Sequence, residues 1–128
     1  MAQILLIEPD RILAETYRLA LEGAGHKVLV CSTAQAAVQA ADRVKPDIVI
    51  LEIQLVEHSG IEFLYEFRSY PDWQNVPVLI QSQVPPSEFS DNLELLKNEL
   101  NVVNYLYKPQ TNLKKLLDTI NNLPSVGM

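Results

Sequence analysis

The stretch Val49-Ile50-Leu51-Glu52-Ile53 is a short apolar run with one carboxylate near its end. It follows Lys45-Pro46-Asp47, and a continuous apolar run of this length after a turn is typical of a strand buried on both faces of a parallel sheet. Glu52 falls at the carboxyl end of this strand, where open α/β sheets bind their ligands. The stretch therefore predicts a central strand that ends in a site residue.

Two further apolar runs are followed directly by charged residues. Residues 4–7 lead into Glu8-Pro9-Asp10, and residues 103–107 lead into Lys108-Pro109. Because the carboxyl ends of parallel strands meet at one edge of a sheet, we expect these charged side chains and Glu52 to converge on one patch.

Apolar runs alternate with helical patterns along the whole chain. Five strands and five helices joined by short connections predict right-handed crossovers and a parallel sheet with helices on both faces. The predicted strands are 4–7, 28–31, 48–51, 76–81 and 102–107, and the fourth helix is expected to bury Phe89, Leu93, Leu96 and Leu100. Predicted cap residues are Asp10, Ser32 or Thr33, Asn101 and Thr111.

Length and charge restrict the class of protein. The 128 residues suit one domain, with residues 1–124 folded and residues 125–128 a frayed tail. A net charge of −6 argues against a broad basic face for nucleic acid and against anchoring to anionic lipid. Cys31 is the single cysteine, so no intramolecular disulfide forms. With no leader pattern and no membrane-length apolar run, we expect a cytoplasmic protein.

Four segments together carry a family resemblance. Residues 4–10 (ILLIEPD), 46–53 (PDIVILEI), 77–82 (PVLIQS) and 105–109 (YLYKP) resemble, in order and spacing, the landmarks of receiver domains of two-component response regulators (CheY-like). The resemblance covers the chain from about residue 4 to residue 123. It implies an α/β fold of the flavodoxin-like (βα)5 type, a three-layer sandwich with a five-stranded parallel sheet in the order 2-1-3-4-5.

The resemblance also implies roles for individual residues. In the family, an aspartate at the end of the third strand accepts a phosphoryl group from a histidine kinase, beside a magnesium ion held by two acids. By position, the site residues here are Glu52 (phosphoacceptor), Glu8 (first metal-site acid), Ser82 and Lys108 (phosphoryl contacts), Tyr105 (switch aromatic) and Pro109 (preceded by a cis peptide bond).

Two positions depart from the family pattern. Pro9 stands where the second metal-site acid is expected, and Glu52 replaces the aspartate. Mg²⁺ demands near-octahedral oxygen ligands, so losing one carboxylate and lengthening another disturbs its site. An extra methylene also displaces the nucleophile by an amount that costs about 100-fold in rate. We therefore predict no firmly bound cofactor, with Mg²⁺ held by Glu8 and Asp10 as the alternative.

Several residues have competing interpretations. For Glu52, an ion pair with Lys108 that fills the space of a phosphoryl group is favoured over a solvated acid. For Asp10, capping the next helix is favoured over metal binding, since it stands directly before that helix. Glu8 as a remnant metal ligand or as a plain carboxylate near Lys108 stays open, as does Tyr105 as a switch or as a half-buried edge aromatic.

These observations predict a receiver-like domain, not an enzyme, that works in a two-component phosphorelay pathway. Its phosphorylation site is expected to be degenerate, so that it acts as a phosphorylation-independent interaction module. Its partners, a histidine kinase, an effector domain or a second copy, would contact the fourth helix, fifth strand and fifth helix. The first alternative is a working phosphoacceptor with a modified magnesium site. The second, a flavodoxin-like small-molecule binder, is disfavoured because no glycine-rich loop follows the first strand.

Overall fold

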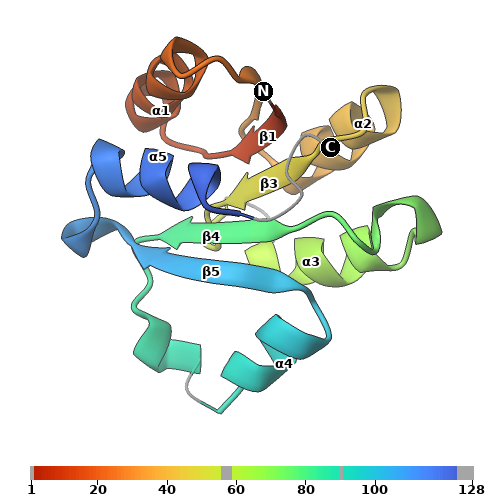
Figure 1. The fold of residues 1–128 in the computed structure, drawn as a ribbon. Helices are drawn as coiled ribbons and strands as arrows, with labels where there is room; N and C mark the ends of the chain where they lie inside the picture. Colours follow the sequence, from red (N-terminus) through yellow and green to blue (C-terminus); the bar gives the residue numbers. More distant parts are fainter. Residues whose placement is uncertain (1, 56–58, 90, 124–128) are drawn as a thin grey trace.

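The computed structural model describes residues 2–55, 59–89 and 91–123. Its five strands form one parallel sheet in the order β2-β1-β3-β4-β5, which confirms the predicted topology (Figure 1). The predicted tail, residues 125–128, lies outside the described part of the chain. The strands are β1 (Gln3–Ile7), β2 (Lys27–Cys31), β3 (Ile48–Leu51), β4 (Val78–Ser82) and β5 (Val102–Tyr107).

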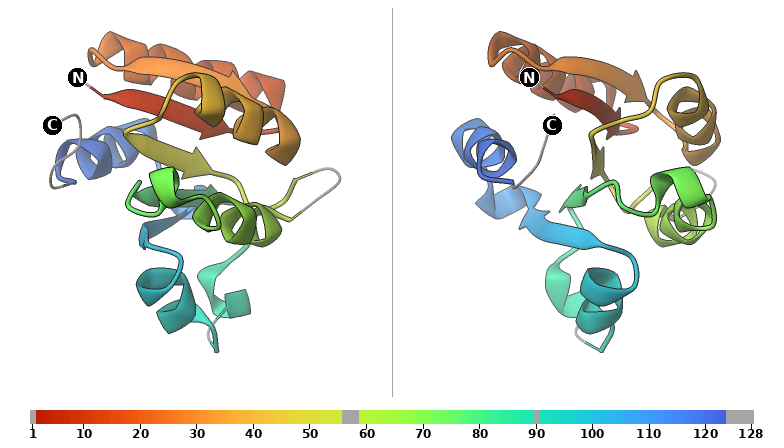
Figure 2. Two further views of the ribbon diagram at one scale, coloured as in Figure 1. Left: turned by 90° about the vertical axis from the view of Figure 1, so that its right-hand side faces the viewer. Right: turned by 45° about the vertical axis from the view of Figure 1, so that its right-hand side comes forward.

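Helices cover both faces of the sheet. Figure 2 shows α1 (Arg11–Gly23) and α5 (Leu113–Asn121) on one side, and α2 (Ala34–Arg43) and α3 (Gly60–Arg68) on the other. The short α4 (Leu93–Asn98) packs beside β5. Over the described ranges, no helix is both long enough and apolar enough to cross a membrane.

The central strand β3 divides the core into two halves. All four of its residues are buried, as the continuous apolar run predicts. Val49 and Leu51 belong to the cluster on the α2–α3 side, while Ile48 and Ile50 belong to the cluster on the α1–α5 side. Strand alternation therefore joins both apolar layers to one segment of chain.

Three of the predicted caps are confirmed. The Asp10 carboxylate accepts two backbone N–H groups of the first turn of α1, each at 3.0 Å. The hydroxyl of Thr33 accepts the N–H of Ala36 at 3.1 Å. Asn101 adopts φ 52°, the left-handed conformation that asparagine tolerates better than most residues.

The prediction that Thr111 caps the last helix is wrong. Asn112 is the N-cap of α5, and its side chain accepts the N–H of Lys115 at 2.8 Å. The hydroxyl of Thr111 instead donates to the carbonyl of Tyr107 at 2.8 Å. The two adjacent residues are both capable caps, and the path of the preceding 3-10 turn, Lys108–Gln110, decides between them.

The predicted cis peptide bond before Pro109 is also wrong, since no described peptide bond is cis. Pro109 lies in the 3-10 turn Lys108–Gln110, which the N–H of Thr111 closes onto the carbonyl of Lys108 at 3.1 Å. The turn is formed with the trans bond that is preferred even before proline.

The fourth helix is shorter than its apolar pattern predicts. Phe89 lies in a separate 3-10 turn, Pro86–Phe89, and α4 begins only at Leu93. Leu96 and Leu100 are buried as predicted, whereas Leu93 remains 44% exposed.

Gly60 is required by a close approach of two backbones. A Cβ at this position would lie 2.7 Å from the Cα of Ile53, and the N–H of Gly60 donates to the carbonyl of Ile53 at 2.6 Å. The first turn of α3 thus packs directly on the chain that leaves β3.

We expect Gly60→Ala to lower the free energy of unfolding by about 1–3 kcal/mol, the usual cost of overpacking, because the obstructing atoms are backbone. Urea denaturation measures this change. Gly23→Ala is the matched control: no atom lies within 4 Å of the added Cβ, and we expect it to stabilise the protein by about 0.4–1 kcal/mol. Equal effects of the two substitutions would contradict the close approach.

Candidate functional site

Charged and polar side chains meet at the carboxyl edge of the sheet, as predicted. The residues with buried polar or charged side chains among those described are Glu8, Glu52, Gln81 and Ser82, and all four lie at the ends of β1, β3 and β4. The Lys108 side chain, which follows β5, is 8% exposed. We call Glu8, Glu52, Ser82 and Lys108 the edge site.

The carboxylate of Glu52 is surrounded by hydrogen-bond donors. Its Oε1 accepts the ammonium of Lys108 at 2.8 Å and the N–H of Gln83 at 3.1 Å. Its Oε2 accepts the N–H of Gln54 at 3.0 Å and the hydroxyl of Ser82. We call these four groups the Glu52 donor set. Two carboxylate oxygens offer about four acceptor positions, so the donor set leaves none of them unused.

Lys108 links Glu52 to a second carboxylate. Its ammonium lies 2.8 Å from Glu52 Oε1 and 2.5 Å from Glu8 Oε1. The predicted ion pair between Glu52 and Lys108 is therefore present, and Glu8 is its third member. Removing one partner of a buried ion pair lowers the stability of the fold, because the other charge is left without a counter-ion.

The same contacts shift the pKa values of both groups. Burial by itself would raise the pKa of Glu52, but the bonds from Gln54, Lys108 and Ser82 outweigh it and hold the pKa below its ordinary value of 4.5. Burial has the opposite effect on a cation and by itself would lower the pKa of Lys108. The bonds to Glu52 and Glu8 outweigh burial and raise this pKa above 10.5. Both groups are therefore held in their charged forms.

The acids after β1 do not fit a magnesium ion. Glu8 Oε2 accepts the N–H of Asp10 at 3.1 Å, and its Oε1 is engaged by Lys108. The carboxylate of Asp10 caps α1, and Pro9 offers no side-chain ligand. In the described part of the chain, no group of three or more His, Cys, Asp or Glu side chains is arranged to hold a metal. Mg²⁺ requires oxygen ligands that are free to surround it, and these oxygens are committed elsewhere.

Tyr105 lies on β5 against the segment that follows β4. Its phenol donates to the carbonyl of Val84 at 2.5 Å, and its ring centroid is 6.3 Å from that of Phe89. The side chain is partly buried, and burial raises the pKa of Tyr105 to about 12. The phenol therefore stays protonated and donates its hydrogen bond throughout the physiological range.

Two contributors to the site, and one buried polar side chain on β4, were not predicted from the sequence. The N–H groups of Gln54 and Gln83 are backbone donors, which residue identity does not reveal. Gln81 is 4% exposed, and its side-chain oxygen has no hydrogen-bond partner within the described ranges. A glutamine inside the run 76–81, otherwise apolar apart from Pro77, was the available signal for Gln81.

Comparison with known sequences gives consistent matches. The family described as the response regulator receiver domain matches residues 4–121. The chain is 35% identical over 109 residues to the KDP operon transcriptional regulatory protein KdpE of Escherichia coli, covering 85% of this chain and 45% of that protein. It is 31% identical over 77 residues to the probable transcriptional regulatory protein TcrX of Mycobacterium tuberculosis, covering 60% and 32%. The chain thus spans less than half the length of these relatives.

Solved structures support the same fold. The non-phosphorylated HemR receiver domain of Leptospira biflexa superposes with a TM-score of 0.82 at 24% identity, covering 100% of this chain and 98% of that one. The chemotaxis response regulator CheY4 of Vibrio cholerae gives a TM-score of 0.82 at 20% identity, covering 94% and 97%.

The shifted pKa values predict how stability depends on pH. A lowered pKa means that Glu52 contributes stability above pH 4.5, and that this contribution is lost as the pH falls through the folded-state value. A raised pKa means that Lys108 contributes below pH 10.5 and that its contribution is lost as the pH rises through the folded-state value. We expect Glu52→Gln to lower the free energy of unfolding by about 3 kcal/mol at neutral pH, the lower end for a broken buried pair because Glu8 still faces Lys108.

Urea unfolding across the pH range measures this dependence. The difference between wild type and Glu52→Gln should shrink as the pH falls below 4.5 and through the lower folded-state pKa, where the carboxylate of the folded wild type becomes protonated. Glu66→Gln, on the exposed side of α3, is the matched control and should change stability by less than about 0.5 kcal/mol. A pH-independent difference for Glu52→Gln would show that its charge does not stabilise the fold.

Proposed function

Because this chain belongs to the family of response regulator receiver domains, we propose that it is a receiver whose phosphoryl pocket is filled by its own Glu52 carboxylate. The observation that carries the proposal is the Glu52 donor set. By resemblance to the family, the hydroxyl after the fourth strand and the lysine after the fifth contact phosphoryl oxygens. Here Ser82 and Lys108 bind the Glu52 oxygens instead, so a carboxylate on the chain takes the place of the transferred group.

The same contacts oppose phosphorylation of Glu52. A carboxylate that attacks a phosphoryl donor needs an oxygen free to approach in line with the bond that breaks. Each Glu52 oxygen already accepts two hydrogen bonds, one of them from Lys108 or Ser82. The alternative, a working phosphoacceptor, gains support from the presence of Ser82 and Lys108 but lacks the acid that Pro9 replaces.

Three hydrogen bonds and the backbone of Val84 connect Glu52 to β5. The hydroxyl of Ser82 donates to Glu52 and accepts the N–H of Val84 at 3.0 Å. The carbonyl of Val84 in turn accepts the phenol of Tyr105 at 2.5 Å. The charge of Glu52 thereby holds the aromatic residue that, by resemblance, changes its packing when receivers switch. We propose that Tyr105 is held permanently in this one position.

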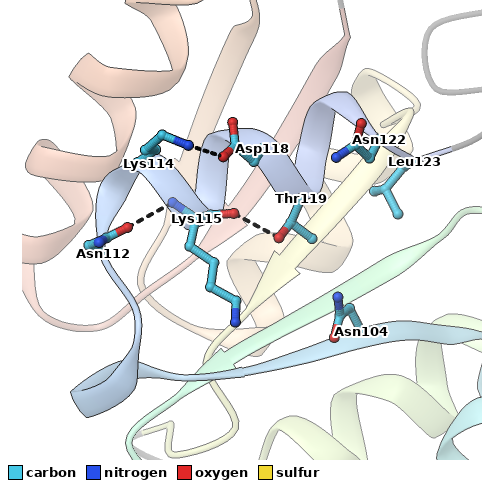
Figure 3. Close-up of a pocket in the computed structure, with 8 residues that line it drawn as sticks. All are labelled: Asn104, Asn112, Lys114, Lys115, Asp118, Thr119, Asn122 and Leu123. Carbon is cyan, nitrogen blue, oxygen red and sulfur yellow. Dashed lines mark hydrogen bonds and ion pairs between the residues drawn. The ribbon is translucent and has the colours of Figure 1, made fainter.

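By resemblance to the family, the contact surface for partners is the face formed by α4, β5 and α5. Each element contributes one exposed apolar residue: Leu93 (44% exposed), Val103 (40%) and Leu113 (39%). A groove of about 570 Å³ separates β5 from α5, and Figure 3 shows the Lys115 side chain extending from α5 toward β5. We propose that a protein partner binds this face: a histidine kinase, an effector domain or a second copy. The relatives that are named transcriptional regulatory proteins extend well beyond the matched region, which supports an effector domain.

The pocket's chemistry predicts the response to a phosphodonor. We expect no phosphoryl adduct on the wild-type chain after exposure to acetyl phosphate and Mg²⁺, as measured by intact-protein mass spectrometry. The double variant Pro9→Asp/Glu52→Asp restores the missing acid and shortens the nucleophile by one methylene. It should accumulate an acid-stable, base-labile acyl phosphate. An adduct on wild-type Glu52 would overturn the proposal and favour the working phosphoacceptor.

The hydrogen bonds between Glu52 and Tyr105 predict which residues respond when the charge of Glu52 is removed. In Glu52→Gln we expect amide chemical-shift changes at Val84 and Tyr105, because Ser82 loses its anionic acceptor. Glu66→Gln is the control, and its changes should stay local to α3. Spectra of Glu52→Gln in which Val84 and Tyr105 keep their wild-type positions would contradict control of Tyr105 by Glu52.

A further inference from the structure

We propose that the ammonium of Lys108 serves as the permanent cation of the edge site, in the position that a divalent metal ion would otherwise take between its carboxylates. The inference rests on the proposed function, because it concerns the same pocket, and it adds the ion dependence of that pocket. It predicts that the wild-type site forms without metal, and that removing the ammonium creates a site for a hard divalent cation.

The first observation is the position of Lys108 between two acids. Its Nζ lies 2.5 Å from Glu8 Oε1 and 2.8 Å from Glu52 Oε1, and both acids are 3% exposed. Two buried carboxylates that both lie within 2.8 Å of one atom repel each other and have lost their hydration. They therefore require a cation close by. Lys108 meets this requirement from within the chain.

The second observation is that the remaining oxygens are committed to protein donors. Glu8 Oε2 accepts the N–H of Asp10, and Glu52 Oε2 accepts Ser82 and Gln54. A divalent ion entering the wild-type site would have to displace the ammonium while both acids stay bound to their backbone donors. The loss of both ion pairs of the buried ammonium opposes this exchange.

The third observation is that the two acids share the ammonium as their common partner. Glu8 Oε1 and Glu52 Oε1 both lie within 2.8 Å of Lys108 Nζ. When that ammonium is removed, both oxygens lose this partner, and carboxylate oxygens are ligands that hard divalent cations prefer.

The test compares the wild type with Lys108→Met, which keeps an unbranched side chain up to the ε position and removes the ammonium. Mn²⁺ is the probe, because it is a hard cation and broadens the amide resonances of nearby residues. In wild type we expect no selective broadening at the amides of Glu8 and Gln54 at millimolar Mn²⁺. In Lys108→Met we expect selective broadening there, and a melting temperature that is below wild type without metal and rises with Mn²⁺ concentration.

Two further variants separate this site from non-specific binding. Lys45→Met removes an exposed lysine before β3 and should behave as wild type. Glu8→Gln/Lys108→Met removes one of the two carboxylates and should lose most of the Mn²⁺ response. If Lys108→Met is unfolded without metal, recovery of its helical circular dichroism by Mn²⁺ supports the proposal, and failure to recover contradicts it.

The outcomes for the wild type distinguish this inference from the proposed function. Selective broadening of Glu8 and Gln54 in the wild type, with no phosphodonor present, would overturn the role of Lys108 as resident cation and leave the filled phosphoryl pocket untouched. A phosphoryl adduct on Glu52 without such broadening would overturn the proposed function alone. A folded Lys108→Met variant that gives no response to Mn²⁺ would also overturn the inference.

Discussion

The carboxylate of Glu52 is a buried anion, and the carboxyl edge of the sheet is built to satisfy it. An unpaired charge at 3% exposure would cost several kcal/mol, so donors must surround it. They come from three places: Gln54 follows β3, Ser82 ends β4 with Gln83 directly after it, and Lys108 follows β5. Only the parallel register of these strands brings the three segments to one point. The fold and the site therefore depend on each other.

Much of this architecture is predictable because a doubly covered parallel sheet imposes a strong pattern on the sequence. The apolar run at β3 predicted that this strand is buried on both faces. The polar residues at the strand ends predicted that Glu8, Glu52, Ser82 and Lys108 converge. The strand order came from the family resemblance and was confirmed. Backbone donors such as the N–H of Gln83 were beyond prediction, because their direction is set by the path of the loop and not by residue type.

The errors share a physical cause. Thr111 and Asn112 are both competent caps, and the trans peptide bond at Pro109 belongs to the turn that places Asn112 at the start of α5. The shortened α4 follows from the separate turn at Pro86–Phe89, which brings Phe89 beside Tyr105. Each error lies in a connection after β4 or β5, where neighbouring residues have similar local propensities and contacts with β5 differ from those expected. The alternation of apolar residues, by contrast, constrains β3 along its whole length.

The central claim is that Glu52 fills the phosphoryl pocket, and beryllium fluoride tests it most directly because this anion mimics a phosphoryl group without chemical transfer. The measurement is an amide NMR titration of the wild-type chain with Mg²⁺ and then beryllium fluoride. If Glu52 occupies its donor set, the resonances of Gln54, Gln83 and Lys108 keep their positions at millimolar concentrations of both. Saturable shifts at these residues that extend to Tyr105 would show that the pocket still accepts a phosphoryl mimic, and would contradict the account.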